Sequence, residues 1–174
     1  MKRRYSSALP TAHIMLRGLI VLNWLTGAAI LALLSAMVIA KDWTLTALGF
    51  PPSSMIFPVI SGLRAIAALG IVAVPLNHVV LARLLAIVES VRNGNPFIPD
   101  NASRLRAIAW ALLGLQTVSL AIAAIGKIIS TPDAPLHLGG GFSVAGWLAI
   151  LLTFVLAGVF EEAARMHADL EGTV

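Results

Sequence analysis

The sequence contains no cysteine and few charged residues. Of its 174 residues, 11% are Asp, Glu, Lys or Arg, about half the share in a soluble domain, and 59% are hydrophobic. The absence of cysteine excludes disulfides, thiolate metal sites and cysteine nucleophiles. So few charges cannot cover the surface of a soluble enzyme of this size, and the composition also excludes a disordered or fibrous chain. The mean hydropathy of +0.92 indicates a small integral membrane protein.

Four long apolar stretches run along the chain, at about residues 18–40, 59–80, 107–126 and 144–160. Each is close to the roughly 20 residues that an α-helix needs to cross about 30 Å of hydrocarbon. A helix satisfies its own backbone hydrogen bonds in lipid, so four transmembrane helices are expected. No repeat, linker or second domain interrupts them. We therefore expect one all-α integral membrane domain over residues 1–174, a bundle of four transmembrane helices.

The helical pattern continues past two of these stretches. After the second, Leu and Val recur at three- and four-residue steps as far as Arg92, where Asn93-Gly94 is typical of a helix end. After the fourth, one apolar face continues to Leu170. We expect the second and fourth helices to extend into the cytoplasm. The four helices are predicted over about residues 14–40, 58–92, 100–128 and 142–170.

The basic residues are distributed unevenly between the two sides of the predicted bundle. Nine of the twelve lie near the N-terminus, between the second and third helices, or in the C-terminal tail. Cytoplasmic segments carry such an excess, so both termini are expected to be cytoplasmic. The pI of about 10.4 does not imply direct binding of nucleic acid, because these residues are needed at the anionic leaflet. The nine are Lys2, Arg3, Arg4, Arg17, Arg83, Arg92, Arg104, Arg106 and Arg165, and the three on the other side are Lys41, Arg64 and Lys127.

The most distinctive stretch, residues 93–101, reads Asn-Gly-Asn-Pro-Phe-Ile-Pro-Asp-Asn. Its structural interpretation is a turn: Gly94 takes a positive φ, Phe97 fills the apolar base of the bundle, and Asp100 or Asn101 caps the third helix. Its functional interpretation is a cytoplasmic docking surface. The residues assigned to the turn or to docking are Arg92, Gly94, Asn95, Pro96, Phe97, Asn101, Arg104, Arg106, Glu161 and Glu162.

Apart from Ser and Thr, five polar or charged side chains fall inside the four apolar stretches. Arg64 is expected to extend to the outer interface, with an anion or substrate contact as the alternative. For the other four, hydrogen bonds between helices are the favoured use. These four are Asn23, Asn77, His78 and Gln116. For Asn23, Asn77 and His78, a shared proton or ligand site is the alternative.

The chain has no pattern typical of an enzyme or a metalloprotein. Its four His residues are scattered, with no His-x-x-x-His or Glu-x-x-His spacing. No Ser/His/Asp set, phosphate loop or dinucleotide fingerprint occurs. We expect a protein that is not an enzyme, with no catalytic residue, metal or cofactor.

The Gly-Asn-Pro-Phe sequence at residues 94–97, followed by Asn101 and Leu105-Arg106, resembles the signature of a bacterial membrane family. The run at residues 154–160, with its acidic extension, is similar as well. The family is domain of unknown function 2975, which has YoaS-like members, and the resemblance covers nearly the whole chain in layout. Its members are typically encoded beside a small helix-turn-helix regulator. The resemblance therefore implies a membrane partner for a transcription factor, and it assigns no catalytic residue.

The expected function is to bind or sequester a small cytoplasmic helix-turn-helix regulator. A regulator held at the membrane has less access to its operator, and its release requires two states of the membrane protein. The alternative is a small oligomeric transporter or export component. Small residues spaced four apart on the first helix are expected mainly to pack against other helices of the same chain. The alternative is that they form the contact between copies in a homo-oligomer. These residues are Ala28, Ala32, Ala36 and Ala40.

The predicted topology can be tested with reporter fusions. A reporter placed after Val174 should report the cytoplasm, and one inserted within residues 130–141 should report the opposite side, because the charge asymmetry orients the chain. Finding both reporters on the same side would contradict the four-helix interpretation.

Overall fold

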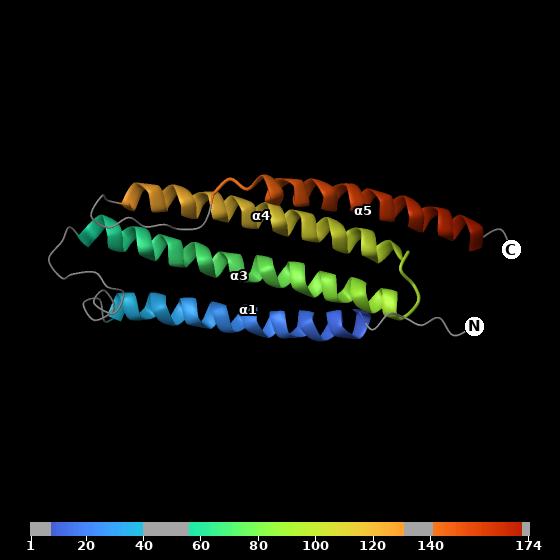
Figure 1. Ribbon diagram of the computed structural model, residues 1–174, viewed down its shortest axis with the longest axis horizontal. Helices are drawn as coiled ribbons and strands as arrows, with labels where there is room; N and C mark the ends of the chain where they lie inside the picture. Colours follow the sequence, from blue (N-terminus) through green and yellow to red (C-terminus); the bar gives the residue numbers. More distant parts are fainter. Residues whose placement is uncertain (1–7, 40–55, 131–140, 172–174) are drawn as a thin grey trace.

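The described part of the chain consists of four long α-helices. The computed structural model describes residues 8–39, 56–130 and 141–171. Each helix is long and apolar enough to cross a membrane, and no strand occurs within those ranges. The prediction of an all-α, multi-pass membrane bundle is confirmed. The helices are α1 (Ala8–Ile39), α3 (Ile56–Arg92), α4 (Pro99–Ile129) and α5 (Val144–Glu171) (Figure 1).

The helix ends lie close to the predicted positions, except at the start of α1. This helix begins at Ala8, whereas the sequence predicted a start near residue 14. Pro10 lies in the first turn, where its missing N–H removes no helical hydrogen bond, so it does not stop the helix. α1 therefore continues past its apolar run, as α3 and α5 were predicted to do.

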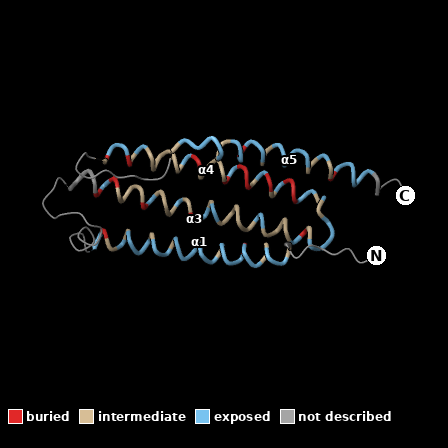
Figure 2. The backbone as a smooth tube through the Cα atoms, viewed as in Figure 1, coloured by how far each residue is buried: buried red, intermediate tan, exposed pale blue. Residues whose placement is uncertain are grey.

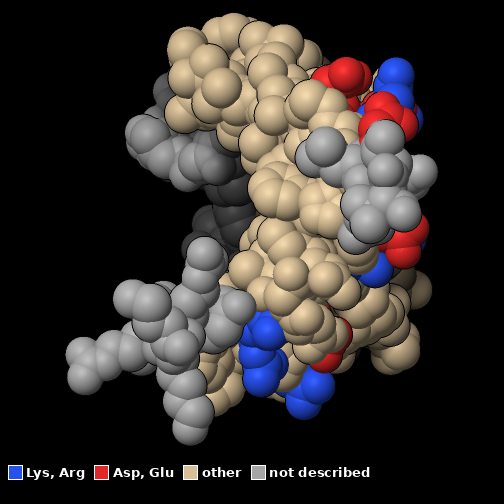
Figure 3. All heavy atoms as spheres, turned by 90° about the vertical axis from the view of Figure 1, so that its right-hand side faces the viewer, with Lys and Arg blue, Asp and Glu red and all other residues tan. Residues whose placement is uncertain are grey.

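The helices form a row in which each one packs against its neighbours in the sequence. α1 packs on α3, α3 on α4, and α4 on α5, while no Cα atom of α1 lies within 8 Å of one in α4 or α5. Figure 1 shows this order from bottom to top, and Figure 3 shows that the row is curved. α4 has a neighbour on each side and carries the largest group of buried residues (Figure 2).

Glycine lets the helices approach one another closely. A Cβ atom on Gly62 of α3 would lie 2.5 Å from Ile129 Cγ2 of α4, and one on Gly27 of α1 would lie 3.0 Å from Val74 Cγ1 of α3. Small residues at such contacts are typical of helices that associate in lipid through van der Waals packing.

Two of the alanines spaced four residues apart on α1 are not part of this packing. Ala28 and Ala32 are exposed and Ala36 is half-buried, whereas Ala40 lies outside the described residues. A four-residue spacing drifts around a helix of 3.6 residues per turn, so the four cannot all face α3. The prediction that Ala28 and Ala32 pack against another helix of the same chain is therefore wrong. Contact with a second copy stays a prediction.

Basic residues mark one end of the apolar layer. Arg64 of α3 contacts the carbonyl oxygen of Met37 of α1, and Lys127 of α4 lies beside the contact between Gly62 and Ile129. Arg64 and Lys127 are therefore level with each other. We call this end the loop end.

Three arginines mark the other end. Gly27 of α1 faces Val74 of α3, and Gly114 of α4 faces Leu76 of α3. The helices are antiparallel, so counting residues from these two contacts gives the height of each arginine along the bundle. Arg17 of α1 and Arg106 of α4 lie within roughly 3 Å of the height of Arg83 of α3. At 1.5 Å per residue, the helix between Arg64 and Arg83 rises roughly 30 Å, which is the thickness of the hydrocarbon core.

We call this second end the turn end, because it contains the connection between α3 and α4. The start of α1 and the end of α5 lie there too (Figure 1). Several residues on which the predicted orientation rests lie outside the described residues. They are Lys2, Arg3, Arg4 and Lys41, together with Val174 and residues 131–140.

Candidate functional site

The turn between α3 and α4 is closed by backbone hydrogen bonds at the end of α3. Gly94 has a φ of +83°, the positive value that the sequence predicted. The amide of Asn95 donates to Ser90 O at 3.1 Å, and the amide of Gly94 donates to Val91 O at 3.1 Å. These two bonds form a Schellman motif, which satisfies carbonyl groups that a helix end leaves open.

α4 begins without a side-chain cap. Pro99 is the first helical residue, and Ile98 occupies the N-cap position with no side-chain hydrogen bond. The predicted cap, Asp100 or Asn101, is wrong because Pro99 already sets the helical φ ahead of both residues. Asn101 lies inside the first turn, where its backbone N–H donates to Ile98 O at 3.0 Å. Its side chain is left for other contacts.

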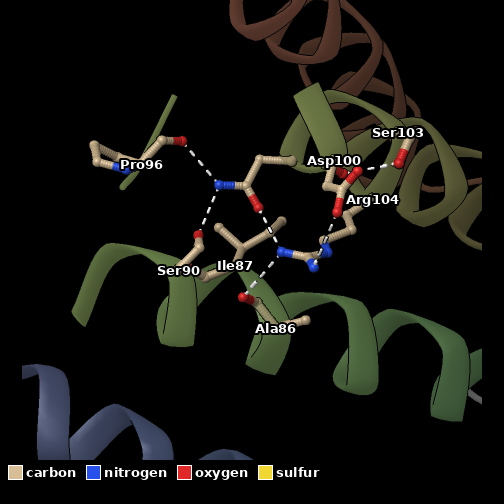
Figure 4. Close-up of polar contacts among 8 residues, drawn as sticks. Ala86, Ile87, Ser90, Pro96, Asp100, Ser103 and Arg104 are labelled. Atoms are coloured by element: carbon tan, nitrogen blue, oxygen red, sulfur yellow. Dashed lines mark hydrogen bonds and ion pairs between the residues drawn. The ribbon is translucent and has the colours of Figure 1, made fainter. Parts of the chain in front are cut away.

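The side chain of Asn101 joins α3, the turn and α4. It is fully buried, with an exposed fraction of 0%. Nδ2 donates to Ser90 Oγ at 2.7 Å and to Pro96 O at 2.8 Å, and Oδ1 accepts from Arg104 Nη1 at 2.9 Å (Figure 4). Both ends of the amide are therefore hydrogen-bonded. A buried polar group satisfied in this way favours one arrangement of its surroundings, since losing a partner costs about 1–3 kcal/mol.

Arg104 extends this network back to α3. Its Nη1 also donates to Ala86 O at 3.3 Å, and the Ser90 hydroxyl donates to Ile87 O at 2.7 Å. Arg104 Nη2 lies 3.8 Å from Asp100 Oδ2, whose side chain is 75% exposed, so this ion pair contributes little. Arg104 was assigned to a docking surface, but its guanidinium is used within the chain.

Phe97 lies at the side of the bundle. It is 47% exposed, and its ring centre is 5.9 Å from that of Phe160 on α5. The prediction that Phe97 fills the base of the bundle is wrong, because a row of helices has no enclosed base. Apolar packing near this end comes instead from Leu105 and Ile108 of α4 with Ala157 of α5.

Two grooves lie where the last turns of α5 pass the turn. One, of about 290 Å³, lies between residues 94–99 and the α5 residues Ala164, His167 and Ala168. The other, of about 340 Å³, lies between the first turns of α4 and residues 161–168. Ala164 and Ala168 line both grooves. Their small side chains leave this space unfilled.

Charged side chains of α4 and α5 pair with one another at the turn end. Arg106 Nη2 lies 2.7 Å from Glu161 Oε2, and Arg165 lies 3.8 Å from Glu161 and 3.9 Å from Glu162. The predicted surface does carry both signs of charge. However, these side chains are about half exposed or more and already paired, so each pair contributes at most about 1 kcal/mol.

At the loop end, Arg64 contacts α1. Its Nη2 donates to Met37 O at 2.6 Å, in the last described turn of α1, where the helix dipole is negative. Its Nε is buried and has no hydrogen-bond partner among the described residues. The sequence predicted that Arg64 extends to the interface. The structure places it level with Lys127, where it joins α1 to α3, and its extension to the interface stays a prediction.

The predicted group of Asn23, Asn77 and His78 is brought together only in part. Asn23 Nδ2 donates to Val74 O of α3 at 3.1 Å, which is the predicted use as a hydrogen bond between helices. His78 packs its ring 5.5 Å from that of Trp24 on α1. Asn77 is exposed on another side of α3.

Gln116 of α4 is buried and reaches the segment before α5. Its Nε2 donates to Gly141 O at 3.3 Å, and its Oε1 would lie 2.5 Å from a Cβ atom on Gly146. Like Asn23, it links one membrane helix to the next part of the chain.

Sequence reasoning missed Ser90, which is buried and accepts the hydrogen bond of Asn101. Its position on α3 could have indicated that it is used in a hydrogen bond. It is a polar residue among the Leu, Ile and Val residues of the extension, where an unsatisfied hydroxyl would be costly.

The described polar groups offer hydrogen bonds and paired charges. None of the described residues forms a group of three or more His, Asp or Glu side chains that could hold a metal ion. What this arrangement provides is a rigid turn beside two grooves, which suits binding.

Comparison with known families matches the chain to a family model. Residues 43–174 match the model of a family described as a protein of unknown function, DUF2975. The chain belongs to this family. The matched region contains α3, α4 and α5 with the whole turn, so the resemblance first seen at residues 94–97 is confirmed. No curated protein and no solved structure matches the chain.

Asn101→Ala should destabilise the protein by about 2–4 kcal/mol, because it leaves the groups around a fully buried amide without partners. Thermal unfolding in detergent measures this. Ser103→Ala is the matched control, since Ser103 is exposed on the same helical turn and should lower the melting temperature far less. Equal melting temperatures for the two variants would mean that the network does not hold the turn.

Gly94→Ala should cost about 1–2 kcal/mol, because a Cβ atom is disfavoured at positive φ. Space is not the reason, since a Cβ atom there would meet nothing within 4 Å. Gly158→Ala has the same open surroundings within α5 and should be neutral or stabilising. The same unfolding measurement compares them, and a Gly94→Ala variant as stable as Gly158→Ala would contradict the left-handed conformation.

Proposed function

We propose that this protein is a non-enzymatic membrane protein of the bacterial inner membrane that binds a small cytoplasmic helix-turn-helix regulator at its turn end. The observation that carries the proposal is the length of the helices there. α3 continues from Arg83 to Arg92, and α5 continues from Glu161 to Glu171. Each extension adds roughly 15 Å beyond the charged level. Crossing the membrane does not require these turns.

The extensions form a surface suited to a protein partner. The Schellman turn and the Asn101 network hold residues 94–99 in one arrangement, so the grooves beside α5 are lined by a pre-organised backbone. Less ordering on binding leaves more of the interaction energy for affinity. Exposed Glu162 and Arg165 add charges of both signs, which favour specific orientation and fast association.

A membrane-bound partner of this kind controls transcription by sequestration. The regulator has reduced access to its operator while it is held at the turn end. A signal releases it only by favouring a state of the membrane protein to which the regulator binds less well. A signal with equal affinity for both states shifts nothing.

A small oligomeric transporter is the second candidate, and the row arrangement favours it. Among the described helices, α1 packs on α3 alone and α5 packs on α4 alone. The two outer helices are therefore open to further copies of the chain. In this case the oligomeric state in detergent or nanodiscs would exceed one, and no regulator would bind.

The test is capture of the tagged full chain from native membranes in mild detergent, with identification of bound proteins by mass spectrometry. A helix-turn-helix protein should co-purify with the wild type. Ala168→Trp should reduce its recovery at least about tenfold, because the indole fills both grooves at a hot-spot position. Met166→Trp is the control, because Met166 is exposed on the same helix and lines neither groove.

Absence of a helix-turn-helix protein from the wild-type capture would contradict the proposed function. Equal recovery with Ala168→Trp and Met166→Trp would instead show that the regulator binds elsewhere. Replacing Glu161 is not a clean test, since this side chain is paired with Arg106 and Arg165 within the chain.

A further inference from the structure

Five of the six described arginines at the turn end fall into two groups, and the sixth, Arg92, is exposed at the end of α3, roughly 14 Å beyond Arg83. Arg104, Arg106 and Arg165, on α4 and α5, lie 3.8, 2.7 and 3.8 Å from carboxylate oxygens. Arg17 and Arg83, on α1 and α3, are exposed and form no hydrogen bond or ion pair with any residue that the structure describes. The first group is paired with carboxylates of the chain, whereas the second group has no counter-charge among the described residues.

The distribution of acidic residues explains this division. α1 contains no Asp or Glu, and α3 contains only Glu89, which is exposed and lies nearly two turns beyond Arg83. All other acidic residues of the described helices are on α4 and α5. Figure 3, which looks onto the turn end, shows acidic side chains beside basic ones at the upper right, and basic side chains with an acidic one beside them at the lower edge. The α1–α3 half of this end is therefore positively charged.

Arg17 and Arg83 also lie at the level expected for lipid phosphates. Both stand at the end of the apolar runs of their helices, roughly 30 Å from the level of Arg64. An arginine at this height can keep its alkyl stem against lipid tails and its guanidinium among the headgroups. Its planar group of donors matches a phosphate better than a lysine does.

We propose that Arg17 and Arg83 bind the headgroup phosphates of anionic phospholipids in the leaflet at the turn end. The turn end is then divided between two kinds of contact. The α1–α3 half contacts the lipid surface. The α4–α5 half, whose charges are already paired, is left free with its grooves. This inference does not depend on the proposed regulator, because lipid would be bound whether or not a protein partner exists.

The test uses the full chain in nanodiscs of mixed phosphatidylglycerol and phosphatidylcholine, with bound lipids counted by native mass spectrometry. The wild type should retain phosphatidylglycerol in preference to phosphatidylcholine. Each arginine near an anionic surface contributes about a fivefold preference, so Arg17→Gln with Arg83→Gln should reduce it about 25-fold. Arg92→Gln with Arg165→Gln lowers the net charge equally, away from the charged level, and should keep most of the preference.

Equal loss in the two double variants would overturn the proposal, since net charge alone would then explain the preference. Retention in Arg17→Gln with Arg83→Gln would overturn it as well. In pure phosphatidylcholine, Arg17→Gln with Arg83→Gln should have the same melting temperature as the wild type, because both side chains are exposed. Arg17→Lys with Arg83→Lys should keep most of the preference for phosphatidylglycerol. If inorganic phosphate displaced phosphatidylglycerol from the wild type, the ligand would be soluble phosphate and the lipid assignment would be wrong.

Discussion

The apolar layer of roughly 30 Å is the constraint on which the rest of this structure depends. Within it, helices are the form that satisfies the backbone, and charged groups are excluded because removing them from water is costly. Arg64 and Lys127 therefore stand at one level, and Arg17, Arg83 and Arg106 stand at the other. Among the described residues, no Asp, Glu, Lys or Arg lies between these levels, and Asn23 and Gln116 are used there as hydrogen-bond donors to backbone carbonyls. The turn and the grooves lie beyond the second level.

Lipid also explains why the helices can stand in a row. In water, an outer helix with a single neighbour would expose too much apolar surface, as α1 does here with Trp24, Leu25 and Leu31. In a bilayer those side chains contact lipid tails, so there is no hydrophobic force to close the bundle. Neighbouring helices are held by close packing at glycines and by single hydrogen bonds. The extended network around Asn101 occurs at the turn end.

The features that the sequence predicted are those determined within one helix or one turn. Helix lengths follow from the apolar runs, and the conformation of Gly94 follows from Asn-Gly-Asn-Pro, whose chemistry ends a helix. The order of packing could not be predicted, because an apolar face toward lipid and an apolar face toward a helix have the same composition. The alanine spacing on α1 is an example, since it looks like a contact surface and Ala28 and Ala32 are exposed. The role of Asn101 was also missed. Its partners Ser90 and Arg104 depend on how α3 aligns with α4.

The central claim is that the layer ends at the level of Arg83 and that the turn end lies in water. Because the chain has no cysteine, single cysteines can carry spin labels without a background. Accessibility to oxygen and to a water-soluble nickel reagent in bilayers should then separate Val72, exposed in the middle of α3, from Ala168, exposed at the end of α5. The account predicts that Val72 is accessible to oxygen and shielded from nickel, and that Ala168 is accessible to nickel. A label at Ala168 that is as shielded from nickel as one at Val72 would contradict it.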